Sequence, residues 1–412
     1  MIRVKNNEID RFSLIAVGFL IAVTANPFFY ETVHPILFGT LFYGFIFLKK
    51  GKKISPQFHF AILFITLIFL GQYFTVGNLS IVTYFGVLMR FFLAYFVLNL
   101  IKQDFFIITS SFVTKMAYLS LLIYIPLTIF PFLVDFLISN VSPYVQAPFI
   151  DEFRAHIVLF DLSSMHIKRF GNFGLNSGFY WEPGAHAIFL IYALAINLFV
   201  KNKIFNKNNL ILIFTILTTF STTGYVSLAI LLLFFLITIK TKKARFKAYF
   251  FLLPILSIII YNSFSNLTFL SSKIEQDIEY MSSSNNVGSR FQSFLFDFNS
   301  WKEYPLFGKD RSTDSQGRAL EFTRALHRNN GLGILLATYG IFSFLIYLYL
   351  AYKGIRMFQN RNNLSKRFSQ VFMILFLLTS FGMPMTLRPY YYALVLLPIV
   401  YKKQETFKRT II

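Results

Sequence analysis

Arginine is the residue type that most strongly suggests chemistry in this chain. Arg90 lies inside the apolar stretch Tyr84–Phe92, where a cation without a partner costs at least about 2.5–3.5 kcal/mol. Guanidinium groups are always charged and bind phosphate oxygens in pairs, so these side chains predict recognition of a phosphate. The alternatives are a structural ion pair or hydrogen bonds to backbone carbonyls for Arg90, and solvated, charge-balanced positions for the other arginines. The others lie in polar segments and are Arg154, Arg169, Arg290, Arg311, Arg318 and Arg324.

Two residues could move a proton. Glu182 stands directly before an apolar run, where a carboxylate could equally be a helix-start residue favoured by the helix dipole. His327 precedes another apolar run, titrates near neutrality and could act as a general base. His186 follows Glu182 by four residues, but two ligands alone are a weak metal signal, so we expect no metal. Tyr180, beside Glu182, is a candidate substrate-binding residue.

The elements that must position these residues are membrane spans. The chain has 412 residues, of which 56% are hydrophobic and only 14% charged, against about 25% charged in an ordinary soluble domain. A spanning helix needs about 20 mostly apolar residues. We therefore predict an all-α integral membrane protein, a single polytopic domain over 1–412 with about twelve transmembrane helices. The apolar runs are 12–30, 34–48, 57–75, 79–101, 106–133, 183–200, 209–222, 224–239, 248–263, 331–352, 368–386 and 388–401.

The net charge of +21 fits this topology. If the N-terminus lies in the cytoplasm and the spans alternate, most Lys and Arg residues fall in the inner segments, while the outer segments are nearly balanced. That distribution follows the positive-inside rule and predicts a multi-pass protein of the bacterial inner membrane with both termini in the cytoplasm. A nucleic-acid surface would not be striped in this way, so we expect no nucleic-acid partner. The chain has no cysteine, which excludes disulfides and thiol nucleophiles.

Two outer segments, 134–182 and 264–330, are much longer than the others, and loops of such length usually carry function. The second contains Arg290 followed by apolar residues at helical spacing, namely Phe291, Phe294, Leu295, Phe298 and Trp301. This pattern predicts an amphipathic helix along the membrane surface, or alternatively a helix packed on a small core of the loop itself.

Four stretches together resemble the superfamily of O-antigen polymerases and O-antigen ligases. They are the segment from Arg169 to Ala187 with Glu182-Pro183, the "T-x-S-x-x-G"-like turn Thr218–Tyr225, the "G-R … P-L-x-G"-like pair Gly288–Arg290 and Tyr304–Gly308, and the "H-N … Y-G"-like stretch from His327 to Gly340, in which Arg328 is inserted. The resemblance covers nearly the whole chain in order and topology.

The resemblance implies a membrane-embedded glycosyltransferase of the GT-C-like type that needs neither metal nor cofactor. Its substrates would be oligosaccharide repeat units linked to undecaprenyl pyrophosphate, and a chain-length regulator could be a further partner beside the lipid bilayer. The growing polysaccharide of an O-antigen, capsule or exopolysaccharide would be transferred onto the next lipid-linked unit at the outer membrane face. Arg169 and Arg290 would bind the pyrophosphate or sugar, and His327 or Glu182 would be the base.

Two alternatives remain. A ligase of the same superfamily would transfer finished glycan to lipid A core or to protein, although the Glu182-Pro183 segment favours a polymerase. A polysaccharide flippase also has about twelve spans. Transporters usually carry ionisable residues in several helices and repeats between halves, which this sequence does not show.

Overall fold

The computed structural model describes residues 9–30, 34–77, 81–101, 104–145, 155–167, 173–238, 290–309 and 329–409, with isolated positions at 246, 249 and 257. The chain divides into two compact units. The first unit comprises Met1–Lys52, Phe91–Tyr225 and Phe358–Ser365. The second unit comprises Lys53–Arg90, Val226–Met357 and Lys366–Ile412. Each unit is described by itself.

Helices occupy every predicted apolar run except 248–263, which lies outside the described residues apart from the isolated positions 249 and 257. The elements are α1 (Arg11–Ala25), α2 (Pro27–Tyr30), α3 (His34–Lys49), α4 (Pro56–Val76), α5 (Ile81–Leu100), α6 (Phe105–Ile129), α7 (Phe132–Asn140), α8 (Ser142–Val145), β1 (His156–Ile157), β2 (Phe160–Asp161), the 3₁₀ turn η1 (Ser163–His166), α9 (Pro183–Lys201), α10 (Lys207–Thr218), α11 (Thr222–Thr238), α14 (Arg290–Glu303), α16 (Gly331–Arg361), α17 (Arg367–Gly382) and α18 (Pro389–Arg409). The predicted separations of α10 from α11 and of α17 from α18 are confirmed.

Within the described residues, five helices are long and apolar enough to cross a membrane: α4, α5, α6, α9 and α16. The remaining apolar helices, such as α3 and α17, are shorter. The protein is therefore an all-α membrane protein, and the number of twelve spans stays a prediction.

Apolar side chains on the outside of α4 show what solvent this helix requires. Phe60, Leu63, Leu67, Leu70 and Phe74 recur at intervals of three and four residues and are all exposed, Phe74 by 81%. A continuous apolar stripe over four turns would be unfavourable in water. Lipid is the solvent that fits it.

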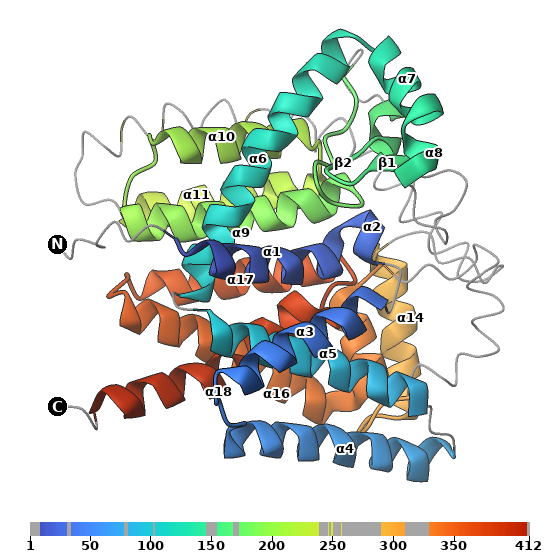
Figure 1. The fold of residues 1–412 in the computed structure, drawn as a ribbon, viewed down its shortest axis with the longest axis vertical. Coiled ribbons are helices and arrows are strands. Elements are labelled where there is room, and N and C mark those ends of the chain that lie inside the picture. The colour runs from blue at the N-terminus through green and yellow to red at the C-terminus, as the bar shows by residue number, and fades with distance from the viewer. Residues whose placement is uncertain are drawn as a thin grey trace. The chain divides into compact units, whose positions relative to one another are not determined.

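The first unit is built around α9, whose side chains from Ala185 to Phe199 are all buried. A helix that is apolar on every side belongs in a core. It contacts α6 and α10, and α6 also contacts α1 (Figure 1). Beyond α6, the first long loop forms α7, α8 and a two-stranded antiparallel hairpin, β1–β2. Its small core joins Tyr124 and Leu127 of α6 to Val134, Phe160, Leu162 and Met165.

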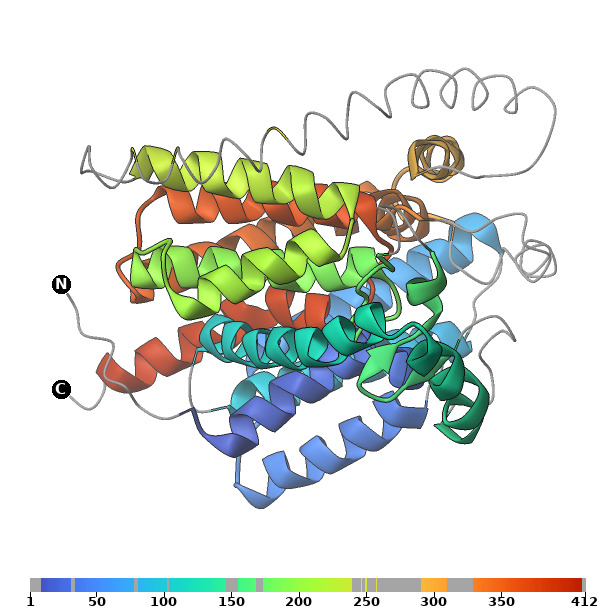
Figure 2. The same ribbon diagram turned by 90° about the horizontal axis from the view of Figure 1, so that it is seen from above.

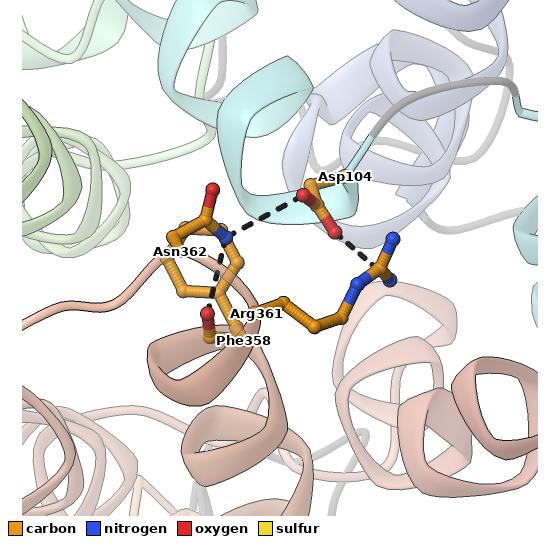
Figure 3. A network of polar contacts seen from close by, with 4 residues as sticks. All are labelled: Asp104, Phe358, Arg361 and Asn362. Atoms are coloured by element: carbon orange, nitrogen blue, oxygen red, sulfur yellow. Dashed lines mark hydrogen bonds and ion pairs between the residues drawn. The ribbon is translucent and has the colours of Figure 1, made fainter. Parts of the chain in front are cut away.

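An ion pair ties the start of α6 to the end of α16 in the first unit (Figure 3). The Asp104 carboxylate lies 3.1 Å from the Arg361 guanidinium, and Nδ2 of Asn362 donates to the same carboxylate at 3.5 Å. An acid before a helix and a base at a helix end also match the two helix dipoles. Both segments belong to the inner set of the predicted topology, so their contact agrees with it.

In the second unit, α16 is interrupted at Gly340, where the backbone has φ 72° and ψ −179°. The segment Pro305–Lys309 fills the interruption. The amide of Lys309 donates to the carbonyl of Ala337 at 2.9 Å, and the amide of Ile341 donates to the carbonyl of Pro305 at 2.9 Å. A side chain at Gly308 or Gly340 would collide with the opposing backbone, at 2.4 and 2.2 Å respectively. The Gly308 and Gly340 stretches, far apart in the sequence, therefore form one joint.

Gln72 of α4 completes this joint. Its Nε2 donates to the carbonyl of Phe307 at 2.8 Å and to that of Thr338 at 2.7 Å, and the side chain has no exposed surface. Non-helical backbone at membrane depth is tolerated only where protein satisfies it. Gln72 thus donates to one carbonyl of the segment that fills the interruption and to one carbonyl of α16 beside it.

We expect Gln72→Leu to lower the free energy of unfolding by about 1–3 kcal/mol, because two buried carbonyls lose their donor. Thermal unfolding in detergent measures the change. Tyr73→Phe, at an exposed position of the same helix, is the control and should be neutral. An unchanged melting temperature for Gln72→Leu would show that the joint does not depend on this bridge.

Candidate functional site

Helix α14 has a polar inner face and an aromatic outer face. Its buried residues are Gln292, Ser293 and Asp297. Phe291 is 56% exposed, and Phe294, Phe298 and Trp301 are partly exposed. The predicted helix is thus confirmed, and its buried residues are polar. The rest of the loop, 264–289 and 310–328, lies outside the described residues, so its packing on a core of the loop stays an alternative prediction.

Within the second unit, α14 lies crosswise to α4, α16 and α17, as Figures 1 and 2 show from two directions. The rings of Phe294 and Phe381 on α17 are 5.6 Å apart. Nζ of Lys302 lies 4.9 Å from the ring centre of Phe298 on the outer face. The helix therefore lies across the ends of spans and does not run parallel to them.

The polar face of α14 meets the first turn of α16. The amide of Asn329 donates to Oγ of Ser293 at 3.1 Å, and Oδ1 of Asn330 accepts from the amide of Gly333 at 2.8 Å, which caps the helix. A Cβ at Gly333 would lie 2.7 Å from Oδ2 of Asp297. The missing side chain at Gly333 is what lets the carboxylate approach the helix start.

The end of α17 closes the same region. A Cβ at Gly331 would lie 2.7 Å from the carbonyl of Ser380, and Oγ1 of Thr386 donates to the carbonyl of Gly331 at 2.7 Å. Ser293, Asp297, Asn330 and Ser380 each have no exposed surface. We call these four residues, together with Gly333, the α16-start cluster.

Two polar atoms of the α16-start cluster have no hydrogen-bond partner among the described residues. Nδ2 of Asn330 and Oγ of Ser380 are buried and have no hydrogen-bond partner within the described part of the chain. Leaving a buried polar group unpaired costs about 1–3 kcal/mol. Such groups usually receive their partner from a water molecule or a ligand.

Arg90 is the tenth residue of the twenty-residue helix α5, which confirms its predicted place inside a span. Its side chain is half-buried, and its Nε is buried without a hydrogen-bond partner. Among the described residues, no ion pair neutralises this guanidinium. The structural ion pair, one of its two alternative explanations, is therefore not found in the described structure, and no carbonyl of the described residues accepts from its Nε.

In the first unit, Asn176 is a fully buried hub that fixes the segment before α9. Its Oδ1 accepts from Oγ of Ser120 at 2.8 Å and from the amide of Gly178 at 3.0 Å. Its Nδ2 donates to Oγ1 of Thr218 at 2.9 Å, and its carbonyl lies 3.2 Å from Nδ1 of His186. One side chain thus connects α6, α10 and the loop that carries Glu182.

His186 is buried against this loop. Because a carbonyl oxygen only accepts, its contact with Asn176 places a hydrogen on Nδ1. Its Nε2 has no partner among the described residues. The ring stacks on Tyr180 with centroids 5.0 Å apart, and a Cβ at Gly178 would lie 2.6 Å from it.

Glu182 and Tyr180 lie together in this loop. Glu182 is the residue before α9, with Pro183 at the first helical position, as predicted. Tyr180 has no exposed surface and lies between His186 and Phe189, so in the described structure it is a core residue. Its predicted role in substrate binding stays a prediction.

A chain of hydroxyl groups supports the loop from the hairpin side. Oγ of Ser177 donates to Oγ of Ser164 at 2.6 Å, and Oγ of Ser164 donates to the Asp161 carboxylate at 2.9 Å. The amide of Asp161 donates to the carbonyl of Gly178 at 2.9 Å. Asn26, after α1, donates to the carbonyls of Val158 and Phe179 at 2.9 and 2.8 Å.

Arg290, half-buried, begins α14 on its polar side. The other predicted residues, Arg154, Arg169, Arg311, Arg318, Arg324 and His327, lie outside the described residues. Among the described residues, no group of three or more His, Asp or Glu side chains could hold a metal ion.

Sequence reasoning missed Asp297, Asn330 and Ser380. Asp297 follows Arg290 by seven residues and therefore shares its helix face, which was a readable signal. Asn330 directly before an apolar run was also readable as a helix cap. Nothing in the sequence indicated that Ser380, some fifty residues later, lies beside them.

No known family, no curated protein and no solved structure matches this chain.

We expect Asn176→Ala to lower the free energy of unfolding by roughly 2–4 kcal/mol, because several buried groups lose a partner at once. Asn140→Ala is the matched control, since Asn140 is exposed and bonds only to the carbonyl of Phe136 in its own helix. Thermal unfolding of both variants in detergent measures the difference. Equal melting temperatures would contradict the role of Asn176 as a hub.

Proposed function

We propose that the protein is a membrane glycosyltransferase that polymerises a bacterial polysaccharide. It transfers the growing glycan from undecaprenyl pyrophosphate onto the next lipid-linked repeat unit at the outer face of the inner membrane. Arginine side chains bind the pyrophosphate, and no metal or cofactor takes part. The termini lie in the cytoplasm, and α14 lies on the outer side.

The observation that carries this proposal is the position of Arg90 inside a span, with no neutralising partner among the described residues. A guanidinium inside a span is unfavourable by several kcal/mol unless it is neutralised, and no ion pair among the described residues neutralises Arg90. Its Nε is buried with no acceptor in the described structure. An anionic ligand would neutralise it, and a lipid-linked pyrophosphate is an anion that is held at the membrane.

In this transfer, the arginines stabilise the charge that develops on the leaving group. When the acceptor hydroxyl attacks the anomeric carbon, negative charge develops on the departing pyrophosphate. Guanidinium groups fixed in advance stabilise that charge without reorganising. Arg290 begins the helix that lies across the ends of other helices in the second unit. In the proposed topology, those ends lie at the level of the lipid headgroups.

The break in α16 bears on the transporter alternative. Interrupted helices in transporters leave carbonyls free to bind ions near the midplane. In this protein, the carbonyls of Ala337 and Thr338 accept from Lys309 and Gln72 instead. The interruption is occupied by the protein's own chain, which favours a structural joint over an ion site.

Deleting the gene and separating the surface glycan on a gel tests the proposed function directly. A polymerase predicts that the ladder collapses to a single repeat unit. A ligase predicts loss of attached glycan while lipid-linked polymer remains. An unchanged ladder would refute both.

Arg290→Ala should abolish polymer in a complementation assay while leaving the amount of protein intact. Losing one preorganised contact to the leaving group typically costs about a hundredfold or more in rate. Lys302→Ala, at an exposed position of the same helix, is the charge-matched control. Full-length polymer from Arg290→Ala would remove Arg290 from the site.

Arg90→Lys separates two roles of Arg90. Lysine keeps the charge but cannot bind two phosphate oxygens with a planar fork. We expect polymer to fall about tenfold or more if Arg90 binds phosphate in this way. Normal polymer from Arg90→Lys, together with loss of polymer in Arg90→Ala, would show that only the charge matters.

The two tryptophans of the chain allow the position of α14 to be measured. In a Trp181→Phe variant in lipid vesicles, the remaining Trp301 should be quenched by lipids brominated near the headgroup end of the acyl chain. An aromatic outer face in the interface predicts this result. The Trp301→Phe variant reports on Trp181, which is 8% exposed, as the comparison. Quenching of Trp301 by aqueous iodide alone would place α14 in water.

A further inference from the structure

The α16-start cluster joins residues of three helices, and the carbonyl of Ser380 is the part of that residue nearest to the start of α16. Asp297 comes from α14, Asn330 and Gly333 from the start of α16, and Ser380 from α17. All three side chains are fully buried. A core with a purely structural role would be more stable at this place if its side chains were apolar or fully hydrogen-bonded.

The chemical character of the cluster identifies the kind of ligand. Nδ2 of Asn330 offers a hydrogen-bond donor, and Oγ of Ser380 offers a donor and an acceptor, both unused among the described residues. The Asp297 carboxylate accepts hydrogen bonds and repels phosphate. A carboxylate, an amide donor and a hydroxyl together complement the hydroxyl groups of a sugar.

The position of the cluster relates it to the proposed phosphate site. Arg290 and Asp297 are seven residues apart, so they share a face of α14 and are separated by about 10 Å along its axis. Arg290 is half-buried, whereas Asp297 is fully buried. The polar row therefore runs from the surface, at Arg290, into the cluster.

We propose that the α16-start cluster binds the acceptor sugar and that Asp297 removes the proton from its attacking hydroxyl. This inference rests on the proposed transferase function. The hydroxyl proton passes to the Asp297 carboxylate, and the hydroxyl oxygen bonds to the anomeric carbon of the donor. The bond from that carbon to the pyrophosphate oxygen breaks, and undecaprenyl pyrophosphate leaves with the electron pair.

The close approach at Gly333 serves this arrangement. With no side chain at Gly333, Oδ2 of Asp297 reaches the first turn of α16, whose N-terminal dipole favours the ionised carboxylate. The contact holds the Asp297 carboxylate at a fixed place beside the first turn of α16.

Asp297→Asn tests the proposal, since asparagine keeps the size of the side chain but cannot accept the proton. Two quantities are measured: polymer per folded protein in the deletion strain, and binding of undecaprenyl pyrophosphate to the purified variant. We expect polymer to fall by about a hundredfold or more while binding changes less than about threefold. Glu303→Gln makes the same chemical change at an exposed position of α14 and should behave as wild type.

Ser380→Ala is the second variant and removes only one buried hydroxyl. We expect it to lower polymer per folded protein about three- to tenfold. If Asp297→Asn does not fold, wild-type polymer from Ser380→Ala overturns the proposal. If Asp297→Asn folds and makes normal polymer, the proposal is likewise overturned.

Arg290→Ala in the same assays separates this inference from the proposed function. If Arg290→Ala abolishes both binding and polymer while Asp297→Asn leaves polymer normal, only the acceptor site is wrong. If Arg290→Ala leaves both unchanged, the proposed pyrophosphate site fails as well. Loss of pyrophosphate binding in Asp297→Asn would show a structural role and overturn the assignment of Asp297 as the base.

Discussion

The satisfaction of buried polar groups in a chain whose solvent is lipid is the constraint on which this structure depends. Lipid cannot hydrogen-bond an exposed carbonyl, so every departure from a regular helix at membrane depth needs a partner from the protein. The interruption of α16 at Gly340 meets this demand with two amides of the chain and with Gln72. The loop before α9 meets it with Asn176.

Buried polar atoms that do not meet this constraint are therefore of interest. Arg90, Asn330 and Ser380 carry buried polar atoms that the described residues do not satisfy. In the proposed transferase, these atoms receive their partners from the bound substrates. The three residues differ in the ligand that they fit. The guanidinium of Arg90 fits an anion, whereas the amide of Asn330 and the hydroxyl of Ser380, near the Asp297 carboxylate, fit sugar hydroxyls.

Helix α14 links the two kinds of site within the second unit. One face is aromatic and turned outward, and the other carries Arg290, Ser293 and Asp297. Its C-terminal end continues into the segment that fills the break in α16, so its position is set by the joint at Gly308 and Gly340. This gives a physical reason for two short motifs that are widely separated in the sequence: their glycines allow two backbones to touch.

The sequence by itself determined where the apolar helices lie, because a run of apolar residues in lipid has no stable alternative to a helix that satisfies its own backbone. It also placed Arg90 inside a span, Glu182 before α9 and Arg290 at the start of an amphipathic helix. Only the tertiary structure decided which face of α14 is buried, because helical spacing is the same for an inward and an outward aromatic stripe. It alone brought Ser380 to Asn330 and Gly308 to Gly340, since such contacts depend on how helices distant along the chain pack, and no local pattern records that.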